Sequence, residues 1–128
     1  MKENLAFIRM NKINQTKQAL LEAGYPAITC RNCMGRGKQM FNMELVDTMS
    51  SGHLTVSEGN ETILETIRLF PKRLITMFVQ NEDVERIIDI IMEVNSTGHP
   101  GDGKIFVLPI TESLRVRDGK LQSDNDTY

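Results

Sequence analysis

The hydrophobic positions of the first third of the chain predict a strand, a helix and a second strand. An apolar run of strand length spans 5–10, and a second predicted strand spans 27–34. Between them we predict a helix that Asn11 caps and that Gly24 follows. The apolar face of this helix consists of Ile13, Leu20 and Leu21.

The second half of the chain repeats this order of elements. A largely apolar run at 74–79 predicts a third strand, and the run at 104–108 predicts a fourth. Asn81 offers a helix cap between them. Apolar side chains then recur with helical spacing at Val84, Ile87, Ile88, Ile91 and Val94.

This order predicts an α+β fold of the ferredoxin-like type, β-α-β-β-α-β, in one domain over residues 1–128. Such a fold places both helices on one face of a four-stranded antiparallel sheet. Strand alternation then turns Phe7, Leu74 or Phe78 toward the other face, because they cannot all meet the helices. We therefore expect self-association to cover that face.

Composition and charge argue against several classes of function. The net charge of −2 argues against a general nucleic-acid binder, which needs a basic face. No apolar stretch approaches the roughly 18 residues of a spanning helix, so we expect no membrane insertion. The charged N-terminal segment does not resemble a signal peptide, and we expect a cytoplasmic location.

The segment 39–70 separates the two halves and shows no sustained hydrophobic period. Connections of this length in compact domains are usually functional or disordered. The segment is acidic on balance, yet it carries apolar residues such as Met40, Met43 and Met49. Methionines adapt to partner surfaces, so we interpret the segment as a contact loop.

Cys30 and Cys33 form a CxxC spacing. We favour the interpretation that these are two ordinary reduced cysteines. A structural zinc site needs four ligands, and the first cysteine of a thioredoxin-like pair stands at the N-terminus of a helix, whereas this segment is predicted to be a strand. A redox or metal module remains the alternative.

The segment 97–104 has the composition of an anion cradle. Its glycines allow backbone amides to converge on phosphate oxygens, and Lys104 adds a mobile charge. An alternating strand at 114–118 would project Arg115 and Arg117 to the same face, and two guanidinium groups suit phosphate. A plain turn and a charged edge strand are the alternatives.

Together these motifs resemble the PII family of nitrogen-regulatory signal proteins over about residues 2–120. The resemblance is carried by Lys12, Gly24, Thr29, the blocks 35–39 and 70–72, Thr97-Gly98, the block 101–107 and the block 115–119. It implies a trimer with ATP or ADP held between neighbouring subunits. It also implies 2-oxoglutarate bound beside MgATP, a T-loop at about 38–71 and a B-loop at about 97–104.

The resemblance also implies which residues bind these ligands. The implied ATP or ADP site consists of Thr29, Gly37, Lys38, Gly101, Asp102, Gly103, Lys104, Arg115 and Arg117. Gln39 would contact both Mg²⁺ and 2-oxoglutarate, and Lys72 would pair with a 2-oxoglutarate carboxylate. Lys38 replaces the arginine usual in the family, and Pro100 removes one amide donor from the B-loop. No catalytic residue and no prosthetic group are implied.

The T-loop segment is long and holds no tyrosine, which excludes uridylylation there. In this respect the chain resembles the nitrogen-fixation branch of the family, and within it the second, longer paralogue of methanogenic archaea. That resemblance implies a homotrimer, or a hetero-oligomer with a paralogue, that inhibits a nitrogenase component by direct contact. 2-Oxoglutarate with ATP would relieve the inhibition.

Other functions stay open. The target could be glutamine synthetase or an ammonium channel, although the segment 48–58 lacks the arginine that channel regulators usually place at the loop tip. A slow ATPase could use Lys104, Arg115 and Arg117 to stabilise charge in the transition state. We favour a sensor without enzymatic activity, because no side chain resembles an organised general base.

Overall fold

The computed structural model describes residues 1–37 and 68–121. Its elements are β1 (Lys2–Arg9), η1 (Met10–Lys12), α1 (Ile13–Glu22), β2 (Thr29–Gly35), β3 (Phe70–Val79), η3 (Asn81–Asp83), α4 (Val84–Asn95) and β4 (Lys104–Pro109). No helix in these two stretches is long and apolar enough to cross a bilayer.

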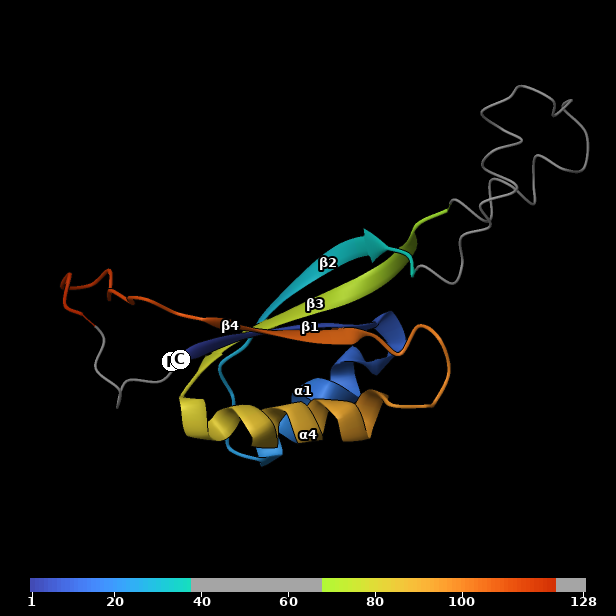
Figure 1. The fold of residues 1–128 in the computed structure, drawn as a ribbon, viewed down its shortest axis with the longest axis horizontal. Coiled ribbons are helices and arrows are strands. Elements are labelled where there is room, and N and C mark those ends of the chain that lie inside the picture. The colour runs from blue at the N-terminus through green and yellow to red at the C-terminus, as the bar shows by residue number, and fades with distance from the viewer. Residues whose placement is uncertain (38–67, 122–128) are drawn as a thin grey trace, which may run out of the picture. The chain divides into compact units, whose positions relative to one another are not determined.

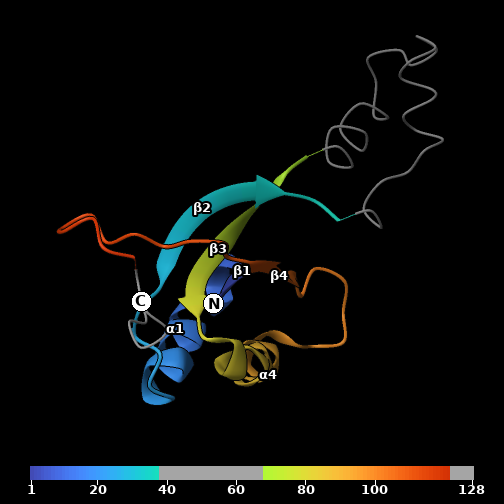
Figure 2. The same ribbon diagram turned by 60° about the vertical axis from the view of Figure 1, so that its left-hand side comes forward.

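The strands form one sheet in the order β2-β3-β1-β4. β1 is central and pairs antiparallel with β3, where Arg9 lies opposite Lys72, and with β4, where Phe7 lies opposite Lys104. Helices α1 and α4 lie side by side on one face of the sheet (Figures 1 and 2). This arrangement confirms the predicted α+β, ferredoxin-like fold.

The core lies between the helices and the sheet. Alternate residues of β1 and β3 point toward the helices, as strand geometry requires. The buried apolar side chains are Ala6, Ile8, Leu20, Ile75, Met77, Val79, Ile87 and Ile91. Burial of each large aliphatic side chain stabilises the fold by about 1.5–3 kcal/mol. The predicted spacing in α4 is confirmed, since Ile87 and Ile91 are fully buried.

A buried hydrogen bond joins the two helices. Asn95 Nδ2 donates to Thr16 Oγ1 at 3.0 Å, and the Thr16 hydroxyl donates to the Lys12 carbonyl at 2.8 Å. Both side chains are almost fully buried. This pairing fixes the end of α4 against α1, and it therefore fixes the point where the following loop begins.

The second face of the sheet carries apolar side chains that the helices do not cover. Phe7 and Phe106 meet edge to face on it, with ring centroids 6.0 Å apart. Phe106 is 48% exposed and Leu108 is 39% exposed. Coverage of this face by other copies of the chain remains a prediction.

The helix termini differ from prediction in two places. Each helix follows a 3₁₀ turn, so Asn11 and Asn81 lie inside turns and cap neither helix. Leu21 was predicted on the apolar face of α1, but it is 56% exposed. The prediction for Gly24 is confirmed, because its φ of 92° is the left-handed conformation that ends a helix.

The predicted strand at 114–118 is wrong. Leu114 makes an isolated bridge to Leu121, and the residues between them turn back on themselves. The Gly119 amide donates to the Arg115 carbonyl at 2.7 Å, and Gly119 has a φ of 67°. Arg115 and Arg117 therefore belong to a turn and not to one face of a strand.

Candidate functional site

The loop between α4 and β4 is organised around the carboxylate of Asp102. Its Oδ2 accepts the Thr97 amide at 2.7 Å and the Gly98 amide at 3.0 Å, while Oδ1 accepts the Thr97 hydroxyl at 2.5 Å. The hydrogen bonds from Thr97, followed by one from Arg9, hold the pKa of Asp102 far below its ordinary value. The loop thus wraps around the carboxylate of one of its own residues, Asp102.

Arg9 ties this loop to the end of β1. Its Nη1 lies 2.5 Å from Asp102 Oδ1, and its Nη2 donates to the Pro100 carbonyl at 3.1 Å. Both charged side chains are partly withdrawn from solvent, with exposures of 28% and 23%. A contact between residues 93 positions apart therefore sets the shape of the loop.

Lys72 brings a second cation to the same place. It lies directly opposite Arg9 in the register of β1 and β3, and its Nζ donates to the Gly101 carbonyl at 3.2 Å. Like charges on directly opposed residues destabilise a sheet unless an anion compensates them. The carboxylate of Asp102 pairs with Arg9, so Lys72 has only a carbonyl as partner among the described residues.

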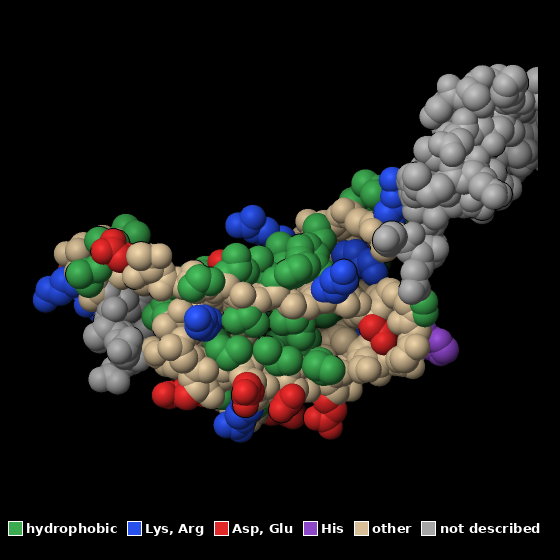
Figure 3. Space-filling view, viewed as in Figure 1, with side chains coloured by type: hydrophobic (Ala, Val, Ile, Leu, Met, Phe, Trp, Pro, Cys, Tyr) green, Lys and Arg blue, Asp and Glu red, His purple; other side chains and the backbone are tan. Residues whose placement is uncertain are grey.

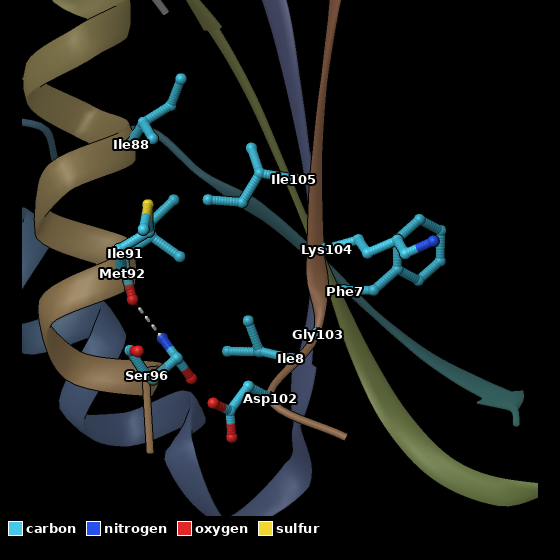
Figure 4. A pocket seen from close by; sticks show the side chains of 11 residues that line it. Phe7, Ile8, Ile88, Ile91, Met92, Ser96, Asp102, Gly103, Lys104 and Ile105 are labelled. Atoms are coloured by element: carbon cyan, nitrogen blue, oxygen red, sulfur yellow. Dashed lines mark hydrogen bonds between the residues drawn. The ribbon is translucent and has the colours of Figure 1, made fainter. Parts of the chain in front are cut away.

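Glycines let the loop approach β1 closely. Gly101 and Gly103 have φ values of 96° and 117°, which other residues rarely adopt. A Cβ on Gly103 would lie 1.8 Å from the Phe7 carbonyl oxygen. Lys104 begins β4 directly after this contact, and its exposed side chain lies with Phe7 on the side of β4 away from α4 (Figure 4).

Three of the expected nucleotide contacts lie at the opposite end of the sheet. Thr29 begins β2 and lines a cavity of about 480 Å³ together with Phe78 and Leu114. Arg115 and Arg117 follow in the turn beyond β4, and Arg115 pairs with Asp118 at 2.8 Å. The loop and this turn project from opposite ends of the sheet (Figures 1 and 2). The length of β1 separates these ends by roughly 25 Å.

Not all of the expected residues can be placed. Gly37 follows β2 and is exposed, with nothing within 4 Å of where a Cβ would be. Lys38, Gln39 and most of the expected T-loop lie outside the described residues. Arg9 was not among the predicted site residues. The only sign of it in the sequence is a cation at the end of an apolar strand.

The cysteines lie in β2, where Cys30 is exposed and Cys33 is partly buried. Residues three apart in a strand point to opposite faces and are about 10 Å apart, too far for a disulfide within this strand. Within residues 1–37 and 68–121, no three His, Cys, Asp or Glu side chains gather as metal ligands would.

Comparisons with known proteins identify the family. The family model described as "Nitrogen regulatory protein P-II" matches residues 1–120. The chain is 43% identical over 122 residues to "Nitrogen fixation nifHD region GlnB-like protein 2" of Methanothermococcus thermolithotrophicus, covering 94% of each chain. A protein with the same description from Methanobacterium ivanovii is 42% identical over 125 residues, covering 97% of this chain and 98% of the other.

Solved structures lead to the same family. A crystal structure of Arabidopsis thaliana PII bound to citrate superposes with a TM-score of 0.65 at 28% identity, covering 94% of this chain and 84% of that one. The chain therefore belongs to the PII family of nitrogen regulatory signal proteins, and it groups with the second nif-region proteins of methanogens.

The role of Asp102 predicts a pH dependence of stability. Its pKa is lower in the folded chain than in the unfolded chain, so its charge stabilises the fold above the unfolded pKa of about 3.9. This contribution is lost as the pH falls through the folded pKa. We expect Asp102→Asn to unfold at lower urea concentration than wild type at pH 7, and the difference to narrow below about pH 4.

Urea unfolding of both proteins between pH 7 and pH 3 measures this difference. Asp89→Asn, on the exposed surface of α4, is the matched control and should show no comparable gap at pH 7. A gap that stayed constant down to pH 3 would mean that the charge of Asp102 does not hold the loop.

Proposed function

We propose that this PII protein senses ATP or ADP together with 2-oxoglutarate and regulates nitrogenase by direct contact. The observation that carries the proposal is the pair of opposed cations, Arg9 and Lys72, at a glycine loop where residues 1–37 and 68–121 place one carboxylate, that of Asp102, beside them. A bound anion would relieve the repulsion between the two cations, which makes this end of the sheet suited to a carboxylate or phosphate ligand.

The ammonium of Lys72, which has a carbonyl but no carboxylate as partner among the described residues, supports the binding of 2-oxoglutarate. A carboxylate of the ligand would replace the Gly101 carbonyl as the partner of Nζ, exchanging a neutral acceptor for a charged one. The Arabidopsis relative binds citrate, which is also a polycarboxylate. Gln39 would complete the site by coordinating Mg²⁺ and contacting 2-oxoglutarate.

The separation of the expected nucleotide contacts supports a site between two copies of the chain. The loop offers Gly101, Gly103 and Lys104 at one end of the sheet, whereas Thr29 and the arginine turn lie at the other end. One copy cannot bring these groups to one nucleotide, but neighbouring copies in a ring can. A homotrimer, or a hetero-oligomer with a paralogue, provides this arrangement.

Within this site the residues would have different roles. Lys104 would contact phosphate from the loop, with Gly37 and Lys38 at the T-loop entry. Arg115 and Arg117 would reach in from the neighbouring copy, and Arg115 would exchange Asp118 for phosphate. The Asp102 carboxylate is already bonded within the loop, so it would act by shaping the backbone amides around the phosphates.

The names of the relatives support nitrogenase as the target, since both archaeal proteins are named after the nitrogen-fixation nifHD region. Ligand binding at the base of the T-loop would bias that loop between states with different affinity for the target. This is linkage between two sites, and it requires no catalysis.

The assignment of Lys72 predicts a selective loss of 2-oxoglutarate binding. We expect calorimetry to detect binding of 2-oxoglutarate only in the presence of MgATP. Lys72→Ala should weaken this binding at least about tenfold, because a charged hydrogen bond is lost, while MgATP binding changes little. Lys2→Ala, at the far end of β1, is the matched control. Equal losses for both ligands would contradict the assignment.

A site between copies predicts that two defective variants restore each other. Lys104→Ala removes the loop contact, and the double variant Arg115→Ala/Arg117→Ala removes the turn contact. Each alone should bind ATP at least about tenfold more weakly. Co-expressed, they should form mixed oligomers in which some sites regain wild-type affinity by calorimetry. Co-expression of Lys104→Ala with Lys104→Glu should restore nothing. Absence of restoration in the first mixture would mean that one copy forms the whole site.

The target can be tested with purified nitrogenase. The protein should inhibit substrate reduction without effectors, and 2-oxoglutarate with MgATP should relieve the inhibition. Deletion of residues 47–59 should abolish inhibition while calorimetry still detects MgATP. Inhibition retained by this variant would place the contact outside the T-loop.

A further inference from the structure

A groove runs between α4 and β4 on the helix side of the sheet. Its volume is about 350 Å³, and its walls are mainly aliphatic. Its aliphatic lining residues are Ile8, Ile88, Ile91, Met92 and Ile105. Figure 3 shows this apolar surface open between the two elements, and Figure 4 shows the side chains converging on it.

The polar end of the groove holds an acceptor without a partner. Asn95 lines the groove and is 4% exposed. Its Nδ2 donates to Thr16 Oγ1 at 3.0 Å and to the Ile91 carbonyl at 2.8 Å. These bonds fix the orientation of the amide, because the reverse orientation would set two oxygens against each other. The Asn95 Oδ1 consequently has no hydrogen-bond partner among the described residues.

We propose that this groove binds a small uncharged molecule with a compact apolar body and one hydroxyl or N–H donor. The volume lies within the range of small-molecule sites, and the aliphatic walls exclude a highly charged ligand. A donor directed at Asn95 Oδ1 would satisfy the acceptor that the fold leaves unpaired. A single small molecule provides both features, and a groove of this size does not require a longer protein segment.

The groove adjoins the proposed nucleotide site, and Phe7 and Lys104 border it in addition to the aliphatic residues named above. The side chains of Lys104 and Phe7 lie on the far side of β4 (Figure 4). Asp102 and Gly103, however, belong both to the loop and to the wall of the groove. A molecule in the groove therefore touches the residue that accepts the Thr97 and Gly98 amides, so binding should be detectable at those amides.

The test uses the full chain with labelled isoleucine and methionine methyl groups and backbone amides, without nucleotide. Cyclohexanol, which has a donor, is compared by NMR titration with cyclohexanone, which matches its size but has none. We expect saturable shifts of the Ile88, Met92 and Ile105 methyl groups and of the Thr97 and Gly98 amides. Cyclohexanol should bind roughly fivefold more tightly than cyclohexanone, the value of one neutral hydrogen bond.

Two variants test the hydrogen-bond acceptor and the cavity separately. Asn95→Leu should remove the difference between the two probes. Ile88→Phe should fill the groove and abolish both titrations, whereas Leu21→Phe, on the exposed surface of α1, should leave both unchanged. Equal affinity of the wild type for both probes would overturn the role of Asn95. Absence of saturable methyl shifts, or shifts that Ile88→Phe leaves intact, would overturn the site itself.

Discussion

The ion pair between Arg9 and Asp102 is the interaction on which the loop before β4 and the adjoining end of the sheet depend. It joins the end of the central strand to the loop before β4, and it leaves the carboxylate bonded on all sides by Thr97, Gly98 and Arg9. Because the Asp102 carboxylate accepts these hydrogen bonds within the chain, the shape of the loop does not depend on a bound ligand. Pre-organisation of this kind improves affinity by reducing the entropy lost on binding.

The same pairing determines which charges are left for a ligand. Because Asp102 pairs with Arg9, the opposed Lys72 has a carbonyl and no carboxylate as its partner among the described residues. The cations that would approach the nucleotide phosphates from elsewhere lie across the sheet, in the turn that holds Arg115 and Arg117. In the proposed site, separation of the two groups in each copy would make assembly a condition for nucleotide binding, so the ligand and the oligomer would stabilise each other.

Periodicity alone predicted the order of helices and strands, because alternate burial in β1 and the helical spacing in α4 are local patterns. It failed where short-range hydrogen bonds compete with such patterns. Asn11 and Asn81 resemble helix caps, yet a 3₁₀ turn precedes each helix and no side chain caps the first turn of either one. The expected arginine strand is a turn because Asp118 binds Arg115 and Gly119 adopts a left-handed conformation.

The candidate site was predictable only as far as its residues follow one another in the sequence. The glycines and Lys104 could be found from their motif, but the contact of Arg9 joins positions 93 apart and no single-sequence pattern encodes it. The groove behind β4 was equally hidden, since it depends on an amide whose orientation is fixed by Thr16 on the other helix. Asp102 and Gly103 belong to both the loop and the groove wall, so a molecule in the proposed groove would contact the residues that shape the loop.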